Sequence, residues 1–197
     1  MHHTENNLIE INNKIKSKIN SLSLDQYNPK VIAVSKTFKE EDILPLLDYG
    51  HFDFGENKVQ EASLKWPKLK EKYKNVKLHM LGKLQTNKVK CAVDIFDFIH
   101  SLDNLKLANK LASEIQKKNK KVKMFIQINL GGEKQKSGIE PNDLEMFYKN
   151  CLSLNLDIVG TMCIPPDNQD PKLFFKELLN LNKKIKLPEI SMGMTND

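Results

Sequence analysis

The sequence predicts an α/β protein with a single domain over residues 1–197. Seven short apolar segments, several rich in β-branched residues, alternate with segments whose apolar residues recur every three or four positions. The connections are short, which favours a parallel sheet with right-handed crossovers. No GxGxxG follows the first predicted strand, where a dinucleotide-binding doubly wound sheet would carry it. We therefore expect a TIM-type (β/α)8 barrel that has only seven of its eight strands.

The first half of the chain begins with an amphipathic helix over residues 8–19, where four apolar side chains lie three or four positions apart. Residues 31–34 form a β-branched run after Asn28-Pro29, and we interpret them as a buried strand that ends at Lys36. The alternation then predicts a helix at 40–49, a strand at 52–54, a helix at 58–72 and a strand at 77–81.

The second half repeats the same rhythm without a linker, an internal repeat or a low-complexity segment. The lysine-rich run at 117–123 lies between a predicted helix and a predicted strand, so we interpret it as a solvated turn. The remaining elements are a short helix at 87–93, a strand at 98–101, a helix at 104–118, a strand at 122–130, a helix at 144–152, a strand at 158–164, a helix at 171–185 and a strand at 189–192.

Composition excludes several classes of function. No apolar stretch approaches the roughly 20 residues of a membrane span, and the beginning of the chain lacks the apolar run of a signal peptide, so we expect a cytoplasmic protein with no membrane partner. All 31 basic residues are lysine, and the net charge is +6. Without arginine the bidentate recognition of bases and phosphates is lost, so we expect no nucleic-acid partner.

Three cysteines, Cys91, Cys151 and Cys163, are widely spaced. Their odd number and spacing fit neither a disulfide framework nor a paired-cysteine zinc site, so we expect reduced, mostly buried thiols and no metal.

Polar side chains collect where the predicted strands end, which is the functional face of a barrel of this type. Lys36 follows the first strand, and a lysine at the end of a buried strand needs a charged or covalent partner to offset desolvation. Desolvation also favours the neutral amine that attacks aldehydes. The alternatives are a lysine that reaches solvent or one that pairs with Glu56. The other polar residues at strand ends are Glu56, Asn57, Gln85, Asn87, Asn129, Ser191 and Thr195.

Six segments in order resemble the YggS/PROSC family, whose barrel is related to the N-terminal domain of alanine racemase. The resemblance covers roughly residues 8 to 197, and the order of the blocks makes it more specific than any one of them. The blocks are AVSKT around Lys36, FGENKVQE at 54–61, HMLGKLQTNK at 79–88, QINLGGEKQKSG at 127–138, GTMCIP at 160–165 and SMGMTND at 191–197.

The resemblance implies that the chain binds pyridoxal 5'-phosphate (PLP) as a Schiff base on Lys36, with Asn57 beside the cofactor. It also implies that Met194 and Thr195 face the phosphate, with Ser191 close behind. Each residue has a structural alternative: Asn57 could cap the next helix, His79 could be a satisfied structural histidine, and Met162 could be core packing. Cys163, one position on in the same strand, should face the opposite way.

The family's role implies a PLP carrier in vitamin B6 homeostasis without a reaction of its own, acting as a monomer, with amino acids or PLP-dependent apoenzymes as further partners. An amino-acid racemase or lyase is the alternative, although no second domain is present to supply a second proton-transfer group. An aldolase-like barrel in which Lys36 attacks a carbonyl substrate directly is a third reading.

The family continues past the last block with an eighth strand that carries an arginine and a Gly-Thr pair of the phosphate site. This sequence stops at Asp197. We therefore expect a C-terminally truncated chain that binds PLP weakly or not at all in isolation, because part of the phosphate site is missing and two sheet edges are open.

Overall fold

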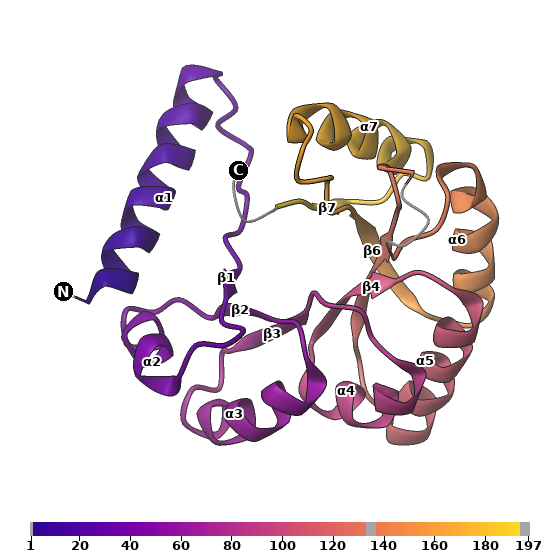
Figure 1. The fold of residues 1–197 in the computed structure, drawn as a ribbon, viewed down its shortest axis with the longest axis horizontal. Helices are drawn as coiled ribbons and strands as arrows, with labels where there is room; N and C mark the ends of the chain where they lie inside the picture. The colour runs from indigo at the N-terminus through magenta and orange to yellow at the C-terminus, as the bar shows by residue number, and fades with distance from the viewer. Residues whose placement is uncertain (1, 133–136, 194–197) are drawn as a thin grey trace.

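The computed structural model describes residues 2–132 and 137–193 and consists of strands that alternate with helices (Figure 1). The helices and strands, with two short 3-10 turns, are α1 (His3–Ser21), β1 (Ala33–Val34), α2 (Glu40–Asp48), β2 (Asp53–Glu56), α3 (Val59–Lys72), β3 (Lys77–Met80), η1 (Thr86–Lys88), α4 (Val89–Ile95), β4 (Phe98–Leu102), α5 (Leu105–Lys118), β5 (Lys123–Gln127), η2 (Pro141–Asp143), α6 (Leu144–Ser153), β6 (Asp157–Met162), α7 (Pro171–Lys184) and β7 (Glu189–Ser191).

The seven strands form one sheet in sequential order, and every neighbouring pair is parallel. Figure 1 shows this sheet curled into an arc, with α2 to α7 on its outer side. β1 and β7 are the two ends of the arc, and α1 lies beside the segment that leads into β1. The prediction of a TIM-type barrel with seven of its eight strands is therefore confirmed for the described residues.

The predicted elements agree with the structure in type and order. The leading helix is longer than residues 8–19, because His2 caps it and it begins at His3. The first strand is shorter than 31–34, and the prediction that it is buried is wrong: Val34 is 41% exposed. Within residues 2–132 and 137–193, β1 is an edge strand that pairs only with β2, so no described strand lies on its other side.

Two apolar clusters lie on the two faces of the sheet. The larger one joins the sheet to its helices and includes Trp66, Leu111 and Cys163. The smaller one, Phe125, Val159 and Met162 with Phe98 packed against it, comes from strands β4 to β6. Met162 and Cys163 thus fall in different clusters, which confirms that neighbouring strand residues face opposite ways and that Met162 is core packing.

Polar side chains cap several of the helices that surround the sheet. Asn104 accepts a hydrogen bond from the Leu107 amide at 2.8 Å and begins α5, which ends at Asn119 in the left-handed conformation. Lys120 and Lys121 lie between α5 and β5 and are exposed, as expected of a solvated turn, whereas Lys117 and Lys118 belong to α5 and Lys123 begins β5. Among the helices of residues 2–132 and 137–193, none is long and apolar enough to cross a membrane.

Candidate functional site

Lys36 lies in a tight turn directly after β1, at the carboxyl end of the strand. The Ser35 amide continues the pairing with β2 by donating to the Gly55 carbonyl at 2.9 Å, and the Phe38 amide donates to the Ser35 carbonyl at 3.2 Å. Thr37 takes a positive φ of 66°, which is uncommon for a β-branched residue. Lys36 is exposed, so the expectation of a desolvated amine is wrong. Its strand forms an edge of the sheet and does not bury it.

Hydrogen bonds hold this turn on both sides of Lys36. On one side, the Ser35 hydroxyl donates to Glu56 Oε1 at 2.8 Å and Lys65 Nζ donates to the Ser35 carbonyl at 2.8 Å. On the other side, the Thr37 amide donates to Glu61 Oε1 at 2.6 Å. Burial alone would raise the pKa of Glu61, but the bonds from Thr37 and Lys65 lower it overall, so Glu61 accepts as a carboxylate. The backbone that carries Lys36 is therefore fixed while its side chain stays accessible.

The centre of this network is a buried ion pair between Glu56 and Lys65. Glu56 is fully buried, and its Oε1 accepts from Lys65 Nζ and from Trp66 Nε1, both at 2.9 Å. Its Oε2 has no partner in the described chain. The suggestion that Lys36 pairs with Glu56 is thus not what the structure shows, because Lys65 of α3 occupies that position. The sequence contains a signal for this pair, because the helical spacing places Lys65 on the buried face of α3. The apolar residues of that face include Ala62, Trp66 and Leu69.

Asn57 follows β2 and is half-buried. The alternative in which it caps the next helix is wrong, since α3 begins at Val59 after Lys58 and no side chain caps it. Instead the backbone of Asn57 lies against Gly82 in the loop after β3. A Cβ at Gly82 would lie 2.3 Å from the Asn57 carbonyl oxygen, so only glycine permits this approach.

A chain of four polar side chains crosses the inner face of the sheet from β2 to β7. His79 Nε2 lies 3.2 Å from Asp53 Oδ1, His79 Nδ1 lies 2.9 Å from His100 Nε2, and His100 Nδ1 lies 2.8 Å from the Ser191 hydroxyl. The His79 ring stacks on Phe98 and the His100 ring on Phe125, with centroids 4.4 and 4.2 Å apart. His79 is thus hydrogen-bonded through both nitrogens, as expected of a structural histidine.

Burial and charge limit the roles of the side chains in this chain of hydrogen bonds. The bond from His79 is the main cause that lowers the pKa of Asp53, so Asp53 accepts the Nε2 proton of His79. Burial, helped by His79, lowers the pKa of His100 well below its ordinary value and keeps that ring neutral. A neutral His100 carries a single N–H, so one of its nitrogens donates and the other accepts in the bonds with His79 and Ser191. The bond with His100 anchors Ser191 at the end of β7.

The other polar residues predicted at strand ends differ in their exposure. Gln85 and Asn87 are exposed around η1, and Asn87 lines a shallow groove on the outer side with Lys106 and Lys110 of α5. Asn129 is buried. Met194 and Thr195 lie outside the described residues. Sequence reasoning missed Lys65, His100 and Asp53, because their partners lie on other elements.

A parallel β/α arc with a lysine at the end of its first strand defines the class of alanine racemase-like barrels. The family model for the alanine racemase N-terminal domain matches residues 12–196, and the chain belongs to that family. Within it, the chain belongs with the pyridoxal phosphate homeostasis proteins. It is 35% identical to the one from Aquifex aeolicus over 85% of this chain and 77% of the relative, and 34% identical to that of Pasteurella multocida over 98% and 88%.

Two solved structures are similar to this chain in fold. PipY of Synechococcus elongatus with PLP bound is 32% identical, with a TM-score of 0.79 over 89% of this chain and 88% of PipY. Alanine racemase of Clostridium difficile, in complex with cycloserine, matches at a TM-score of 0.62 and 15% identity over 83% of this chain and 48% of the racemase, which shows the shared fold alone.

Proposed function

We propose that this protein binds PLP covalently through Lys36 and acts in PLP homeostasis without a reaction of its own. The observation that carries the proposal is the turn at Lys36, which is hydrogen-bonded on both sides while the amine remains exposed. Relatives named for PLP homeostasis and the PLP-bound PipY structure support the same cofactor. PLP supplies an aldehyde that a lysine amine holds covalently.

The residues around the turn fit such a group. Lys36 provides an accessible amine on a hydrogen-bonded turn, so its side chain and not the backbone must be ordered when it is occupied. Asn57 and Ser191 lie at the carboxyl ends of β2 and β7, on the face where barrels of this type bind ligands. We propose that Asn57 lies beside the cofactor and that Ser191 fixes the end of β7 through His100. Met194 and Thr195, proposed for the phosphate, follow three and four positions after Ser191.

The test is a titration with PLP followed by absorbance near roughly 420 nm, where protonated lysine adducts of PLP absorb. We expect a band in the wild-type chain and none in Lys36→Ala. Lys39→Ala is the matched control, since Lys39 is an exposed lysine three residues further on. Borohydride reduction and peptide mass mapping should place the label on Lys36. Equal bands in both variants would sink the proposal.

The same titration tests the expectation that PLP binds weakly. A dissociation constant in the low micromolar range would contradict that expectation and leave the role of Lys36 intact.

The alternative function is an amino-acid racemase or lyase. A racemase needs a proton-transfer group on each face of the cofactor. Incubation of the PLP-loaded chain with L-alanine in heavy water distinguishes the two: the carrier predicts no deuterium at the α-carbon above the level seen with Lys36→Ala. Exchange that depends on Lys36 would establish catalysis.

Transfer of PLP to an apoenzyme, measured as recovered activity of that enzyme, tests the proposed partners.

A further inference from the structure

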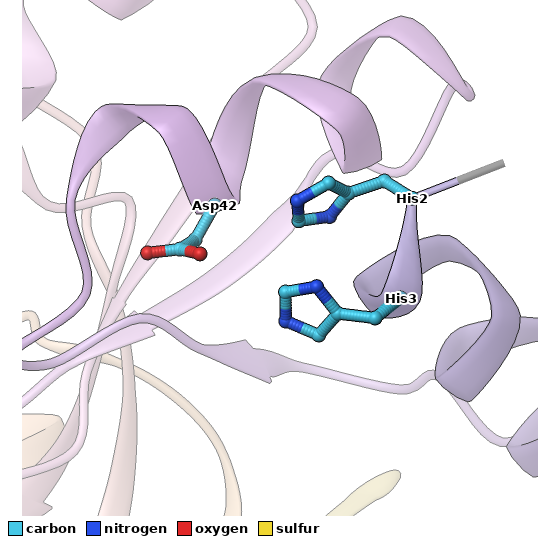
Figure 2. Close-up of side chains that lie close together, drawn as sticks. All are labelled: His2, His3 and Asp42. Atoms are coloured by element: carbon cyan, nitrogen blue, oxygen red, sulfur yellow. The ribbon is translucent and has the colours of Figure 1, made fainter.

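We propose that His2, His3 and Asp42 form a binding site for a divalent transition-metal ion, best suited to Zn²⁺, which joins α1 to α2. Each residue offers one ligand atom, and the three atoms lie within 4.8 Å of one another. Figure 2 shows both imidazole rings extending from the start of α1 toward the Asp42 carboxylate on α2. This site is independent of the PLP function proposed for Lys36.

The donor set determines the kind of ion. Two imidazoles and one carboxylate suit Zn²⁺, whereas Mg²⁺ and Ca²⁺ prefer oxygen ligands alone. Three protein ligands leave the fourth tetrahedral position to water. Bonds of about 2.0 to 2.1 Å bring tetrahedral ligands to about 3.3 Å from one another. The three atoms must therefore approach by at most about 1.5 Å, which the torsions of the exposed His3 side chain and of the partly exposed His2 and Asp42 can supply.

The surroundings leave these ligands available. The Thr4 amide donates to His2 Nδ1 at 3.4 Å and the Thr4 hydroxyl lies 2.8 Å from the same nitrogen, so Nε2 is the atom left for the ion, which displaces its proton on binding. Within the described part of the chain, no lysine forms an ion pair with Asp42. Glu40 and Glu41 precede Asp42 in the first turn of α2, so two more negative charges lie near the carboxylate. The first turn of α2 thus carries three negative charges against one positive charge, Lys39, at its N-cap, which favours a cation.

An ion at this position would stabilise the attachment of α1. Leu8 is the one buried residue of α1 in the described structure, and Ile11 is 45% exposed. The helix is therefore held by little apolar contact for its 19 residues. A metal that bridges the first turns of α1 and α2 would add a cross-link that exists only in the folded chain, and so would raise the melting temperature.

The experiment is calorimetric titration of the chain, without a purification tag, with zinc chloride at neutral pH. We expect one ion to bind per chain, and His3→Gln and Asp42→Asn each to weaken binding at least about tenfold. Glu41→Gln is the matched control, because it removes the same charge from the neighbouring position and should keep the affinity within about twofold. Cobalt(II) absorbance should report a tetrahedral site in the wild-type chain and lose it in Asp42→Asn.

Thermal unfolding with zinc and with a chelator provides a second measurement. Zinc should raise the melting temperature of the wild type and of Glu41→Gln, and should leave that of His3→Gln unchanged. The proposal is overturned if no zinc binds, or if Asp42→Asn and Glu41→Gln bind equally well, since the second result would mean that the histidine pair alone captures the ion.

Discussion

The Nδ1 atom of His100 and the hydroxyl of Ser191 are hydrogen-bonded at 2.8 Å, although 91 positions separate them in the sequence. His100 lies on β4 and Ser191 on β7, which are not neighbours in the sheet. The bond therefore braces two distant strands across the inner face of the arc. His100 is neutral at this place, because burial lowers the pKa of its ring well below the ordinary value.

The neutral state of His100 predicts a loss of stability in acid. Its pKa in the folded chain is well below 6.5, the value expected in the unfolded chain. Below about pH 6.5 the unfolded chain therefore binds a proton that the folded chain does not, and the free energy of unfolding falls by up to about 1.4 kcal/mol per pH unit. Burial also lowers the pKa of His51, which adds in the same direction.

Urea unfolding at a series of pH values between about 7.5 and 5 measures this slope. His100→Gln should show a shallower decline than the wild type. His3→Gln, which removes an exposed histidine, should keep the wild-type slope when a chelator is present. Identical slopes for the wild type and His100→Gln would contradict the account.

The ion pair between Glu56 and Lys65 predicts a large and specific loss of stability. Lys65→Met leaves a fully buried carboxylate without its cation, and we expect the free energy of unfolding to fall by about 3 to 5 kcal/mol. Lys68→Met, an exposed position on the same helix, should change it by less than about 0.5 kcal/mol. The double variant Glu56→Gln with Lys65→Met should recover part of the loss, and no recovery would mean that packing dominates.

The contact between Gly82 and Asn57 predicts that Gly82→Ala is destabilising. The added Cβ would lie 2.3 Å from a backbone oxygen, which cannot move aside as a flexible side chain does. We expect a cost of about 1 to 3 kcal/mol in unfolding free energy, together with weaker PLP binding if Asn57 is displaced. Gly50→Ala, where nothing lies within 4 Å, should show only the smaller strain of its positive φ. Equal thermal shifts would contradict the steric account.

The three thiols should differ in reactivity. Burial raises the pKa of both Cys151 and Cys163 to about 12, whereas Cys91 is exposed. A thiol reagent should label one cysteine in the native chain and three after denaturation. Cys91→Ser should abolish native labelling, and rapid labelling of that variant would show that the buried thiols open to solvent.

Much of the fold could be predicted from the chain because each element carries its own local signal. The periodic apolar pattern predicted each of the seven strands, and Met162 and Cys163 face opposite sides as a strand requires. The burial of β1 was predicted wrongly, since an apolar run indicates a buried strand only if neighbours cover both of its sides. That condition depends on the order of strands and not on the residues of β1.

The candidate site, like the fold, could be predicted from the sequence only in part. Lys36 and Asn57 follow strands, so their place at one face of the barrel came directly from the alternation of elements. The residues that support the site could not be found in this way. Lys65 bonds the turn that carries Lys36, and His79 and His100 lead to Ser191. All three lie inside helices or strands, and each is polar at a position where an apolar residue would fit the pattern equally well.

The sequence by itself determined the alternation of strands and helices, the lysine at the end of the first strand and the family to which the chain is similar, because these depend on residues that are close together along the chain. Only the tertiary structure decided that Lys65 pairs with Glu56 and that a chain of hydrogen bonds through two histidines joins Asp53 to Ser191. The physical reason is that a buried polar group must find its partner in space, and the curl of the sheet sets which side chains meet.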